Sequence, residues 1–338
     1  MIKKAIQTLI HGGTLEREDA YHAIMNVMTG EATQAQIGGF ITALRMHGET
    51  PEIIAGAAQA MRETSIKVKC DDPDAVDIVG TGGDGAKTFN ISTAAAFVTA
   101  GAGITVAKHG SYGVSSQCGS ANVLAALGIN LDYSPEQVER CLNETGIAFL
   151  FAQTFHPAMK NAAGPRKELG FWSLFNILGP LCNPADIKKG VIGVFRPELV
   201  PIMTDAAAQL GMTYLFVVHG HDGLDEITTT TTTSMMEIRR GKLESYEVHP
   251  AGFGIPTAEK EDITGGDPLE NAGIIRRLLS GEEHGPKRDI LLLNAAFAIM
   301  AGGKTGAPPE AMALAAESID SGAALKKLDL LIERSRKG

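Results

Sequence analysis

Residues 75–110, AVDIVGTGGDGAKTFNISTAAAFVTAGAGITVAKHG, alternate between apolar runs and glycine-rich turns. The run at 75–79 predicts a strand that enters a glycine-rich turn, residues 92–103 predict a helix, and 104–107 predict a second strand. A strand, a loop, a helix and a further strand in this order are typical of an α/β fold with a parallel sheet.

The same alternation recurs toward the C-terminus. Residues 189–195 and 214–220 predict strands, with a helix at 199–211 between them. The last part of the chain predicts helices at 286–300 and 310–335. The sequence therefore predicts an α/β domain around a central, mainly parallel sheet.

The N-terminal residues differ, because they predict helices with no strand between them. Thr14 and Thr33 are expected to cap two of these helices, and Pro51 to lie in the first turn of another. The apolar segment around 167–186 also predicts helix, and we expect it to fold back onto them. The predicted units are a small all-helical domain and a large α/β domain, with the bounds 1–66 completed by roughly 167–186, and 70–166 with 187–338.

The composition narrows the classes of function. The 338-residue chain is 44% hydrophobic and 20% charged, which is typical of a globular protein with a sizeable core. Its net charge of −9 disfavours binding to nucleic acids. Four scattered cysteines without a C-x-x-C pair favour a reducing compartment. No signal peptide is evident, and the most apolar run, 94–107, is too short to span a bilayer. We therefore expect a cytoplasmic protein that binds neither nucleic acid nor a membrane.

The glycine-rich turn, GTGGDGAKTFNIST at residues 80–93, has the composition of an anion-binding loop. Glycines between a strand and a helix let backbone N–H groups approach a phosphate, and the helix N-terminus adds partial positive charge. Asn90, Ser92 and Thr93 stand where the helix begins, as caps or as ligand donors. The alternative is a tight turn with an ordinary cap. The pattern matches neither a P-loop nor the dinucleotide-binding fingerprint, and we favour a phosphate site.

A second polar loop, KHGSYGVSSQCGSAN at residues 108–122, follows the second predicted strand. Lys108 with several hydroxyls and glycine N–H groups suits a phosphate or pyrophosphate, at the strand ends where α/β proteins place ligands. His109 is equally compatible with a packed histidine and with a ligand contact.

The motif HGHDGLDE, residues 219–226, follows a strand and contains adjacent Asp225 and Glu226. Such carboxylates suit Mg²⁺, which binds through one or two carboxylates plus substrate phosphates; a solvated acidic turn is the alternative. We exclude zinc because His219 and His221 have no third ligand at a suitable spacing. No nucleophile stands out, so the motifs predict a magnesium-complexed diphosphate and catalysis by positioning and electrostatic stabilisation.

Eight motifs resemble, in order, those of the anthranilate phosphoribosyltransferase family. They are GTGGD, NIST, KHG, GSA-VL-ALG, HPAMKN, RKELG, FNILGPLCNP and HGHDGLDE, and they extend over almost the whole chain. The resemblance implies a fold of the nucleoside phosphorylase/phosphoribosyltransferase type, an active site between the domains, and a homodimer joined through the helical domains. It implies transfer of the phosphoribosyl group of phosphoribosyl pyrophosphate to the amino group of anthranilate, with release of pyrophosphate, in tryptophan biosynthesis.

The resemblance also implies residue roles. Phosphoribosyl pyrophosphate would be bound by Gly80, Gly83, Asp84, Thr88, Asn90, Ile91, Ser92, Thr93, Lys108, Gly110, Ser115, Ser116 and Ser120. The acceptor would be bound by Gly80, His109, Ser111 and Arg166, with Arg166 facing the anthranilate carboxylate. Mg²⁺, as two ions, would be held by Ser92, Asp225 and Glu226. Lys108, His109 and Arg166 would position the reactants, and no residue is assigned as a general base.

The acceptor side departs from the family pattern at four positions. Ser111 and Tyr112 stand where the family usually has Asn and Arg, Asn122 where it has Asp, and Trp172 where it often has Arg. One interpretation is drift, with a neutral pair replacing an exposed ion pair at little cost in stability. The other is a changed acceptor. Arg166 indicates that any acceptor bears a carboxylate, and we favour anthranilate.

Two rival functions are less consistent with these motifs. A pyrimidine-nucleoside phosphorylase of the same fold would need a Ser-rich phosphate-binding segment in place of KHG. Its reaction would not require the carboxylates of Asp225 and Glu226. A non-catalytic relative that binds nucleic acid would need a basic surface.

Overall fold

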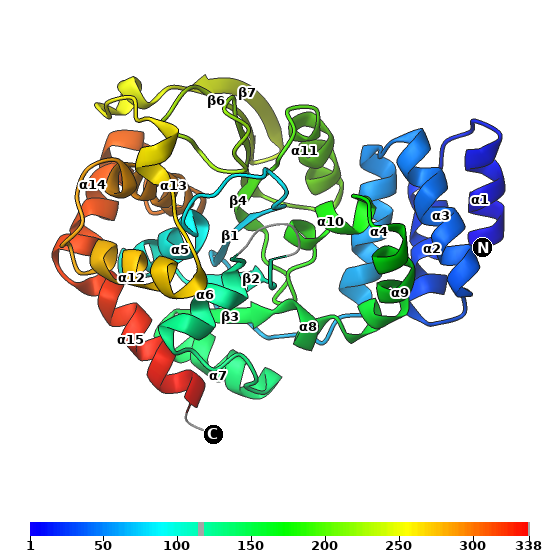
Figure 1. Cartoon of the computed structure of the whole chain (residues 1–338), viewed down its shortest axis with the longest axis horizontal. Coiled ribbons are helices and arrows are strands. Elements are labelled where there is room, and N and C mark those ends of the chain that lie inside the picture. The colour runs from blue at the N-terminus through cyan, green and yellow to red at the C-terminus, as the bar shows by residue number, and fades with distance from the viewer. Residues whose placement is uncertain (114–117, 337–338) are drawn as a thin grey trace.

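The computed structural model describes residues 1–113 and 118–336, and it comprises a bundle of helices and a larger α/β part. The bundle, mostly blue in Figure 1, lies at one end of the molecule, and the C-terminal helices lie at the other. Ser115 and Ser116, both predicted to bind a diphosphate, lie outside the described residues.

Four N-terminal helices form most of the bundle. They are α1 (Ile2–Ile10), α2 (Arg17–Met28), α3 (Gln34–His47) and α4 (Pro51–Glu63). Thr33 caps α3 through a reciprocal capping box, as predicted. The prediction that Thr14 caps α2 is wrong, because α2 begins after Glu16 and has no side-chain cap. Glu18 and Asp19 in its first turn instead supply the negative charge that favours a helix N-terminus.

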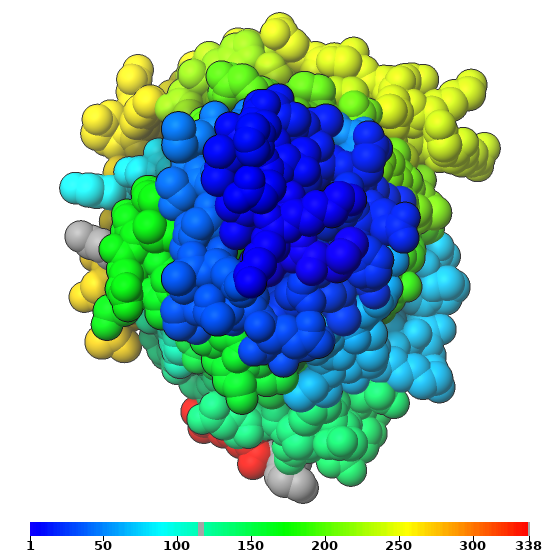
Figure 2. Space-filling model, turned by 90° about the vertical axis from the view of Figure 1, so that its right-hand side faces the viewer, coloured from blue at the N-terminus to red at the C-terminus, as the bar shows by residue number. Residues whose placement is uncertain are grey.

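The chain returns to the bundle after its first three strands. Helix α9 (Lys160–Leu169) packs on α2 and α3, and the short α10 (Leu174–Ile177) packs on α3. Figure 2 views the bundle end on and shows green, mid-chain segments against the blue helices. The apolar core of the bundle continues into the α/β part through residues such as Ile192 and Val217. The exact bounds of the two domains therefore stay a prediction.

The α/β part is built on a sheet whose described strands follow the order β3-β2-β1-β4-β5-β6-β7. The strands are β1 (Val76–Gly80), β2 (Val106–Gly110), β3 (Ile147–Phe151), β4 (Lys189–Gly193), β5 (Tyr214–Gly220), β6 (Thr233–Arg239) and β7 (Lys242–Val248). Neighbours from β3 to β5 run parallel, and β6 and β7 are added antiparallel. The predicted central, mainly parallel sheet is confirmed.

The side chains of β5 show how the sheet separates two apolar cores. Tyr214, Phe216 and Val218 belong to one core, and Leu215 and Val217 belong to the other, because successive side chains of a strand point to opposite faces. Helices α5 (Ile91–Gly101) and α13 (Pro286–Ala301) pack on each other and on the sheet, while α11 (Leu199–Gln209) contacts β5, β6 and α4. Both faces are thus covered, as parallel strands require.

The remaining helices and 3₁₀ turns complete the α/β part. They are α6 (Ser120–Leu127), α7 (Pro135–Thr145), α8 (Ala152–Phe155), η1 (Pro157–Met159), η2 (Gly179–Leu181), η3 (Pro250–Phe253), η4 (Lys260–Ile263), α12 (Pro268–Leu279), α14 (Pro308–Asp320) and α15 (Ala323–Arg336). Within the described ranges, no helix is both long and apolar enough to cross a membrane.

The sequence patterns do not predict β3, β6 or β7. Every residue of β3 is buried, so its sequence lacks the polar–apolar alternation that identifies a half-exposed strand. Strands β6 and β7 form a hairpin through Arg240 and Gly241, whose φ values of 52° and 77° are both positive. Such a turn is most readily predicted from Asn-Gly or Asp-Gly, and this chain uses Arg-Gly.

Candidate active site

A cavity of about 580 Å³ is lined by residues at the carboxyl ends of β1 and β2 and by residues of the helices α4 and α9. Its wall from the α/β part includes Val79, Gly80, Thr81, Gly82, His109, Gly110, Ser111, Tyr112, Gly113, Gly119 and Ser120. The rest of the lining comes from α4 and from residues 152–180, and it includes Met61, Ala152, Gln153, His156, Pro157, Met159, Lys160, Ala163, Arg166, Trp172, Phe175, Asn176, Gly179 and Pro180. The predicted residues that the structure brings together here are Gly80, His109, Gly110, Ser111, Ser120 and Arg166.

A buried carboxylate fixes the floor of this cavity. Asp77, near the start of β1, accepts hydrogen bonds from the backbone N–H of His109 at 3.2 Å and from Asn183 Nδ2 at 2.8 Å. Asn183 Nδ2 also donates to the Ala107 carbonyl at 2.8 Å. Burial raises the pKa of Asp77 to about 6. These bonds together bring β1, β2 and the segment after η2 into one arrangement.

Two histidines line the cavity as neutral imidazoles. His109 Nδ1 lies 3.1 Å from the Gly179 carbonyl oxygen, which can only accept, so the proton resides on Nδ1. His156 hydrogen-bonds to the backbone of Cys182. Burial lowers the pKa of His109 to about 3 and that of His156 to about 4. The ring centroids are 5.1 Å apart, and neither buried Nε2 atom has a hydrogen-bond partner among the described residues.

Arg166, in the last turn of α9, brings a cation to the same cavity. Its guanidinium carbon lies 5.4 Å from the centre of the Phe175 ring, and burial lowers its pKa. In the part of the chain that the structure describes, no carboxylate forms an ion pair with it. A half-buried guanidinium without a protein counter-charge suits a ligand that carries a carboxylate.

The glycines of the turn after β1 are required by close packing. A Cβ at Gly80 would lie 2.1 Å from an oxygen of Asp225, and one at Gly83 would lie 2.1 Å from the Trp172 ring. The backbone N–H of Gly82 donates to Asp225 Oδ2 at 2.6 Å. Only glycine therefore lets this turn pass between the acidic motif and Trp172.

A second polar cluster adjoins the cavity behind this turn. Glu226 Oε1 accepts from the backbone N–H of Ser92 at 3.0 Å, and Lys108 Nζ donates to the Ile78 carbonyl at 2.5 Å. Lys108 Nζ also lies 3.5 Å from Ser92 Oγ. The prediction that Lys108 lies in a loop after a strand is wrong, because Lys108 lies within β2 and is buried. Its amine there is close enough to interact electrostatically with the carboxylates of Asp77, Glu226 and Asp225.

The acidic groups of this cluster repel one another. Burial, followed by the charge of Asp225, raises the pKa of Glu226 to about 8 and that of Asp84 to about 7. Burial also raises the pKa of Asp225, and it lowers that of Lys108. The arrangement concentrates carboxylates around one protein cation, which is an electrostatic environment that an added cation would stabilise.

The other predicted diphosphate residues surround the start of α5. Asn90 donates from Nδ2 to the Cys118 carbonyl at 2.9 Å, and Asp84 Oδ1 accepts from the Ala86 N–H at 3.1 Å. Thr88 forms an isolated antiparallel bridge with Thr264. Ile91 and Thr93 are buried, and Thr93 Oγ1 has no partner within the described ranges. These residues are not among those that line the cavity.

The four departures from the family pattern occupy different places. Asn122 Oδ1 accepts from the backbone N–H groups of Gly113 and Gly119, at 3.1 and 3.0 Å, so it ties the two ends of the polar loop. Tyr112 packs edge-on against Phe151, with ring centroids 5.1 Å apart. Ser111 lines the cavity. Trp172 lies over the glycine-rich turn and packs on Phe195, at 4.5 Å between centroids.

Our sequence analysis names no site role for several cavity residues. His156, Gln153, Met61 and Asn176 all line the cavity, and His156 carries a buried nitrogen without a partner in the described ranges. His156 stands at the head of HPAMKN, a motif that could have indicated it. Met61 lies on an apolar helix face and has no sequence signal that distinguishes it from core residues.

The neutral, buried state of His156 predicts a pH-dependent difference in stability between the wild-type chain and a His156→Gln variant. The folded-state pKa is about 4, below the ordinary value of 6.5. The stability that this residue contributes is thus present above pH 6.5 and is lost as the pH falls toward 4, where the unfolded chain binds the extra proton.

Glu226 and Asp84 have raised pKa values and act in the opposite direction, so the difference between the two chains is the informative quantity. We expect the variant to gain stability relative to the wild type, by about 1.4 kcal/mol per pH unit once the pH is well below the ordinary histidine pKa. Urea unfolding of both chains at pH 7 and pH 5 measures it. A difference that does not change with pH would contradict this state of His156.

Comparisons with known proteins agree with this architecture. Residues 3–65 match the model of the glycosyl transferase family, helical bundle domain, and residues 72–325 match that of the glycosyl transferase family, a/b domain. The anthranilate phosphoribosyltransferase of Acetivibrio thermocellus is 52% identical over 334 residues, covering 98% of this chain and 96% of the relative. That of Desulfosudis oleivorans is 50% identical over 333 residues, covering 98% of each chain.

Solved structures show the same likeness. Anthranilate phosphoribosyltransferase from Thermus thermophilus superposes with a TM-score of 0.93 at 42% identity, covering 98% of this chain and 99% of that one. The enzyme from Saccharomyces cerevisiae in complex with PRPP and Mg has a TM-score of 0.91 at 31% identity, with coverage of 99% and 97%. With both domain models matched and relatives this similar over nearly its whole length, the chain belongs to the anthranilate phosphoribosyltransferase family.

Proposed function

We propose that this chain transfers the phosphoribosyl group of phosphoribosyl pyrophosphate to the amino group of anthranilate and releases pyrophosphate, as a step of tryptophan biosynthesis. The observation that carries the acceptor is Arg166, a half-buried guanidinium that faces the cavity and has no carboxylate partner in the described ranges. An acceptor carboxylate would complete a charge-assisted, bidentate pair there. The Saccharomyces cerevisiae relative has been solved with 4-fluoroanthranilate and with PRPP and Mg.

The two histidines suit the other end of the acceptor. Their bare Nε2 atoms can only accept hydrogen bonds, and an aromatic amine supplies N–H donors. Accepting these N–H groups would orient the amine lone pair toward the anomeric carbon. Because both imidazoles stay neutral, they would not compete with Arg166 for the carboxylate. The acceptor is thus positioned at both ends, without a dedicated base.

The diphosphate would lie along the glycine-rich turn and the start of α5. We assign its binding to residues of that turn and helix and of the polar loop after β2, namely Gly80, Gly83, Asp84, Thr88, Asn90, Ile91, Ser92, Thr93, Lys108, Gly110, Ser115, Ser116 and Ser120, of which Ser115 and Ser116 lie outside the described residues. Ile91 has a buried apolar side chain, so its contribution would come from its backbone N–H at the helix N-terminus. Trp172, packed over Gly83, would exclude water from this side.

The acidic cluster fits Mg²⁺ on the chemistry of its oxygens. Asp225 and Glu226 offer carboxylate oxygens beside the Ser92 hydroxyl, and their raised pKa values reflect a crowd of negative charge around Lys108. We propose that Ser92, Asp225 and Glu226 would hold Mg²⁺, as two ions together with the diphosphate substrate. When bound, Mg²⁺ would neutralise the charge that develops on the leaving pyrophosphate. Lys108 would hold the two carboxylates in place behind the turn.

The direct test of the function is an assay with the full chain. The protein is mixed with anthranilate and phosphoribosyl pyrophosphate, with and without Mg²⁺, and the fluorescence of anthranilate is followed. We expect rapid loss of fluorescence that depends on Mg²⁺. Loss that does not depend on Mg²⁺ would remove Asp225 and Glu226 from the metal site. Retained binding of phosphoribosyl pyrophosphate without turnover of anthranilate would indicate another acceptor, with Ser111 and Tyr112 as the residues that select it.

Substitution of Arg166 tests the acceptor side alone. Arg166→Ala should raise the KM for anthranilate by roughly ten- to a hundredfold, because a charge-assisted pair contributes about 1.5–3 kcal/mol. The KM for phosphoribosyl pyrophosphate should change little. The matched control is Lys167→Ala, which removes an exposed cation from the same helix turn. Equal effects on both KM values would show that Arg166 does not bind the acceptor.

We also propose that two copies associate through the helical bundle and act in the cytoplasm. Ile10 and Met46, on α1 and α3, are large apolar side chains that are 65% and 85% exposed. Burying them in an interface would stabilise a dimer. We expect Met46→Lys to weaken association in sedimentation equilibrium. A wild-type chain that stays monomeric at micromolar concentration would overturn this assembly.

A further inference from the structure

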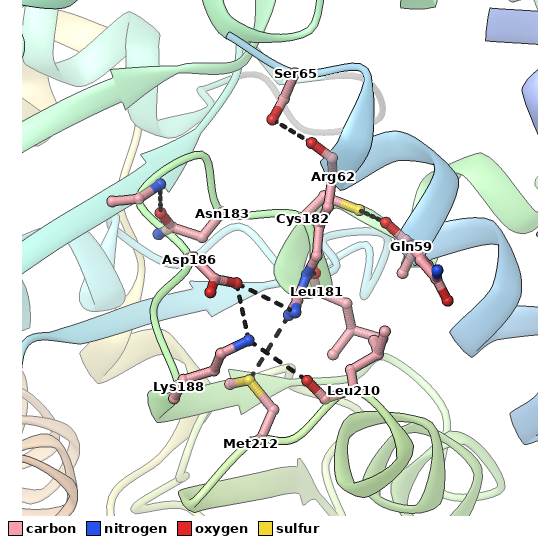
Figure 3. Close-up of polar contacts among 12 residues, drawn as sticks. Gln59, Arg62, Ser65, Leu181, Cys182, Asn183, Asp186, Lys188, Leu210 and Met212 are labelled. Carbon is pink, nitrogen blue, oxygen red and sulfur yellow. Dashed lines mark hydrogen bonds and ion pairs between the residues drawn. The ribbon is translucent and has the colours of Figure 1, made fainter. Parts of the chain in front are cut away.

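Arg62, at the C-terminal end of α4, is the centre of a polar junction between the bundle and the α/β part (Figure 3). Its side chain is only 11% exposed. Nε donates to the Leu181 carbonyl at 2.6 Å, and a terminal nitrogen lies 3.8 Å from Met212 Sδ. The other terminal nitrogen lies 3.5 Å from Asp186 Oδ1. The most direct of these bonds is therefore to a backbone carbonyl.

Leu181 ends the turn η2, which forms one wall of the cavity. Gly179, at the start of η2, accepts from His109 Nδ1, and both Gly179 and Pro180 line the cavity. Asn183 ties the other end of this segment to Asp77 and Ala107 in the sheet. Residues 179–183 are thus held from two sides, by Arg62 from the bundle and by Asn183 from the sheet.

The ion pair with Asp186 is the weaker part of the junction. Asp186 is 62% exposed and shares the same oxygen with Lys188, whose Nζ lies 2.8 Å away. Exposed, shared ion pairs contribute little to stability. The carbonyl of Leu181, in contrast, belongs to a buried residue and would lose a charged donor if Arg62 were replaced.

We propose that Arg62 is a positioning residue for the acceptor. It holds residues 179–183 against α4. Through the Gly179 carbonyl it fixes the orientation of the His109 ring, and with it the position of the cavity lining formed by Gly179 and Pro180. Met61, the preceding residue, lines the cavity itself. The C-terminal end of α4 therefore contributes one lining residue and the arginine that holds residues 179–183 in place. The kinetic part of this inference rests on the proposed function, and the packing part does not.

The test compares Arg62→Met with Arg17→Met. Arg17 also joins the bundle to the α/β part through a backbone carbonyl, that of Gln209 at 3.0 Å, but it lies outside the cavity lining. Methionine keeps an unbranched stem and removes every donor. We expect Arg62→Met to raise the KM for anthranilate on the order of tenfold, with less than about a twofold change for phosphoribosyl pyrophosphate. Arg17→Met should change neither, and Arg62→Lys should recover part of the loss.

A second measurement does not depend on turnover. Cys182 is a free, fully buried thiol within the held segment. Alkylation of the folded chain with iodoacetamide, followed by mass spectrometry, should label Cys182 on the order of tenfold faster in Arg62→Met than in the wild type or Arg17→Met. If the labelling rate is unchanged, Arg62 does not hold the segment and the proposal fails.

Faster labelling without a selective rise in the anthranilate KM would also overturn the role in acceptor positioning. If Arg17→Met also raised the KM for anthranilate and left that for phosphoribosyl pyrophosphate unchanged, the effect would come from the packing of the bundle on the α/β part in general. That result would overturn a specific role for Arg62. A wild-type chain that does not use anthranilate would refute the proposed function, and the labelling result would then decide the packing part alone.

Discussion

A carboxylate buried in a parallel sheet must have its oxygens hydrogen-bonded, and Asp77 meets this requirement with partners from two other segments. The backbone N–H of His109 and the amide of Asn183 both donate to it. Loss of either partner would leave a desolvated acceptor, which is costly in free energy. These bonds link the backbone of β2 at His109 and the segment after η2 to β1, while the His109 ring is held separately by the Gly179 carbonyl. The floor of the cavity is thereby hydrogen-bonded to the sheet at β1 and β2.

The turn after β1 separates two electrostatic environments that different reactants need. On one side lie neutral imidazoles, apolar side chains and the Arg166 guanidinium, which favour a flat aromatic acid. On the other lie three carboxyls and Lys108, which favour a cation-bound diphosphate. Because residues 80 and 83 are glycines, the turn between the two environments is no thicker than its backbone. The two reactants can therefore approach each other beside this turn. Because the two environments are separate, a substitution on the acceptor side should have little effect on binding of the diphosphate, and the reverse should also hold.

Much of the fold could be predicted from local patterns. The strand, glycine turn and helix at 75–101 and the helix cap at Thr33 are signals within a few residues, and the structure confirms both. The partnerships that shape the cavity are not local, because Asn183 meets Asp77 across 106 positions and Arg62 meets Leu181 across 119. The burial of Lys108 could not be predicted for a related reason. The carboxylates that surround its amine are distant in sequence, so the residues next to Lys108 do not reveal them. The motif comparison identifies Arg166, whereas periodicity alone does not.

The sheet ends differently at its two edges. At one edge lies β3, which contacts α7 and α15 and is buried along its whole length. At β7 the edge strand is largely exposed, and it bears Lys242, Glu244 and Glu247. An unpaired edge offers free N–H and C=O groups to any extended chain, and charged side chains along it oppose such pairing. The charged residues of β7 therefore disfavour aggregation through this edge, and the antiparallel pair β6–β7 separates the edge from the parallel strands that carry the site.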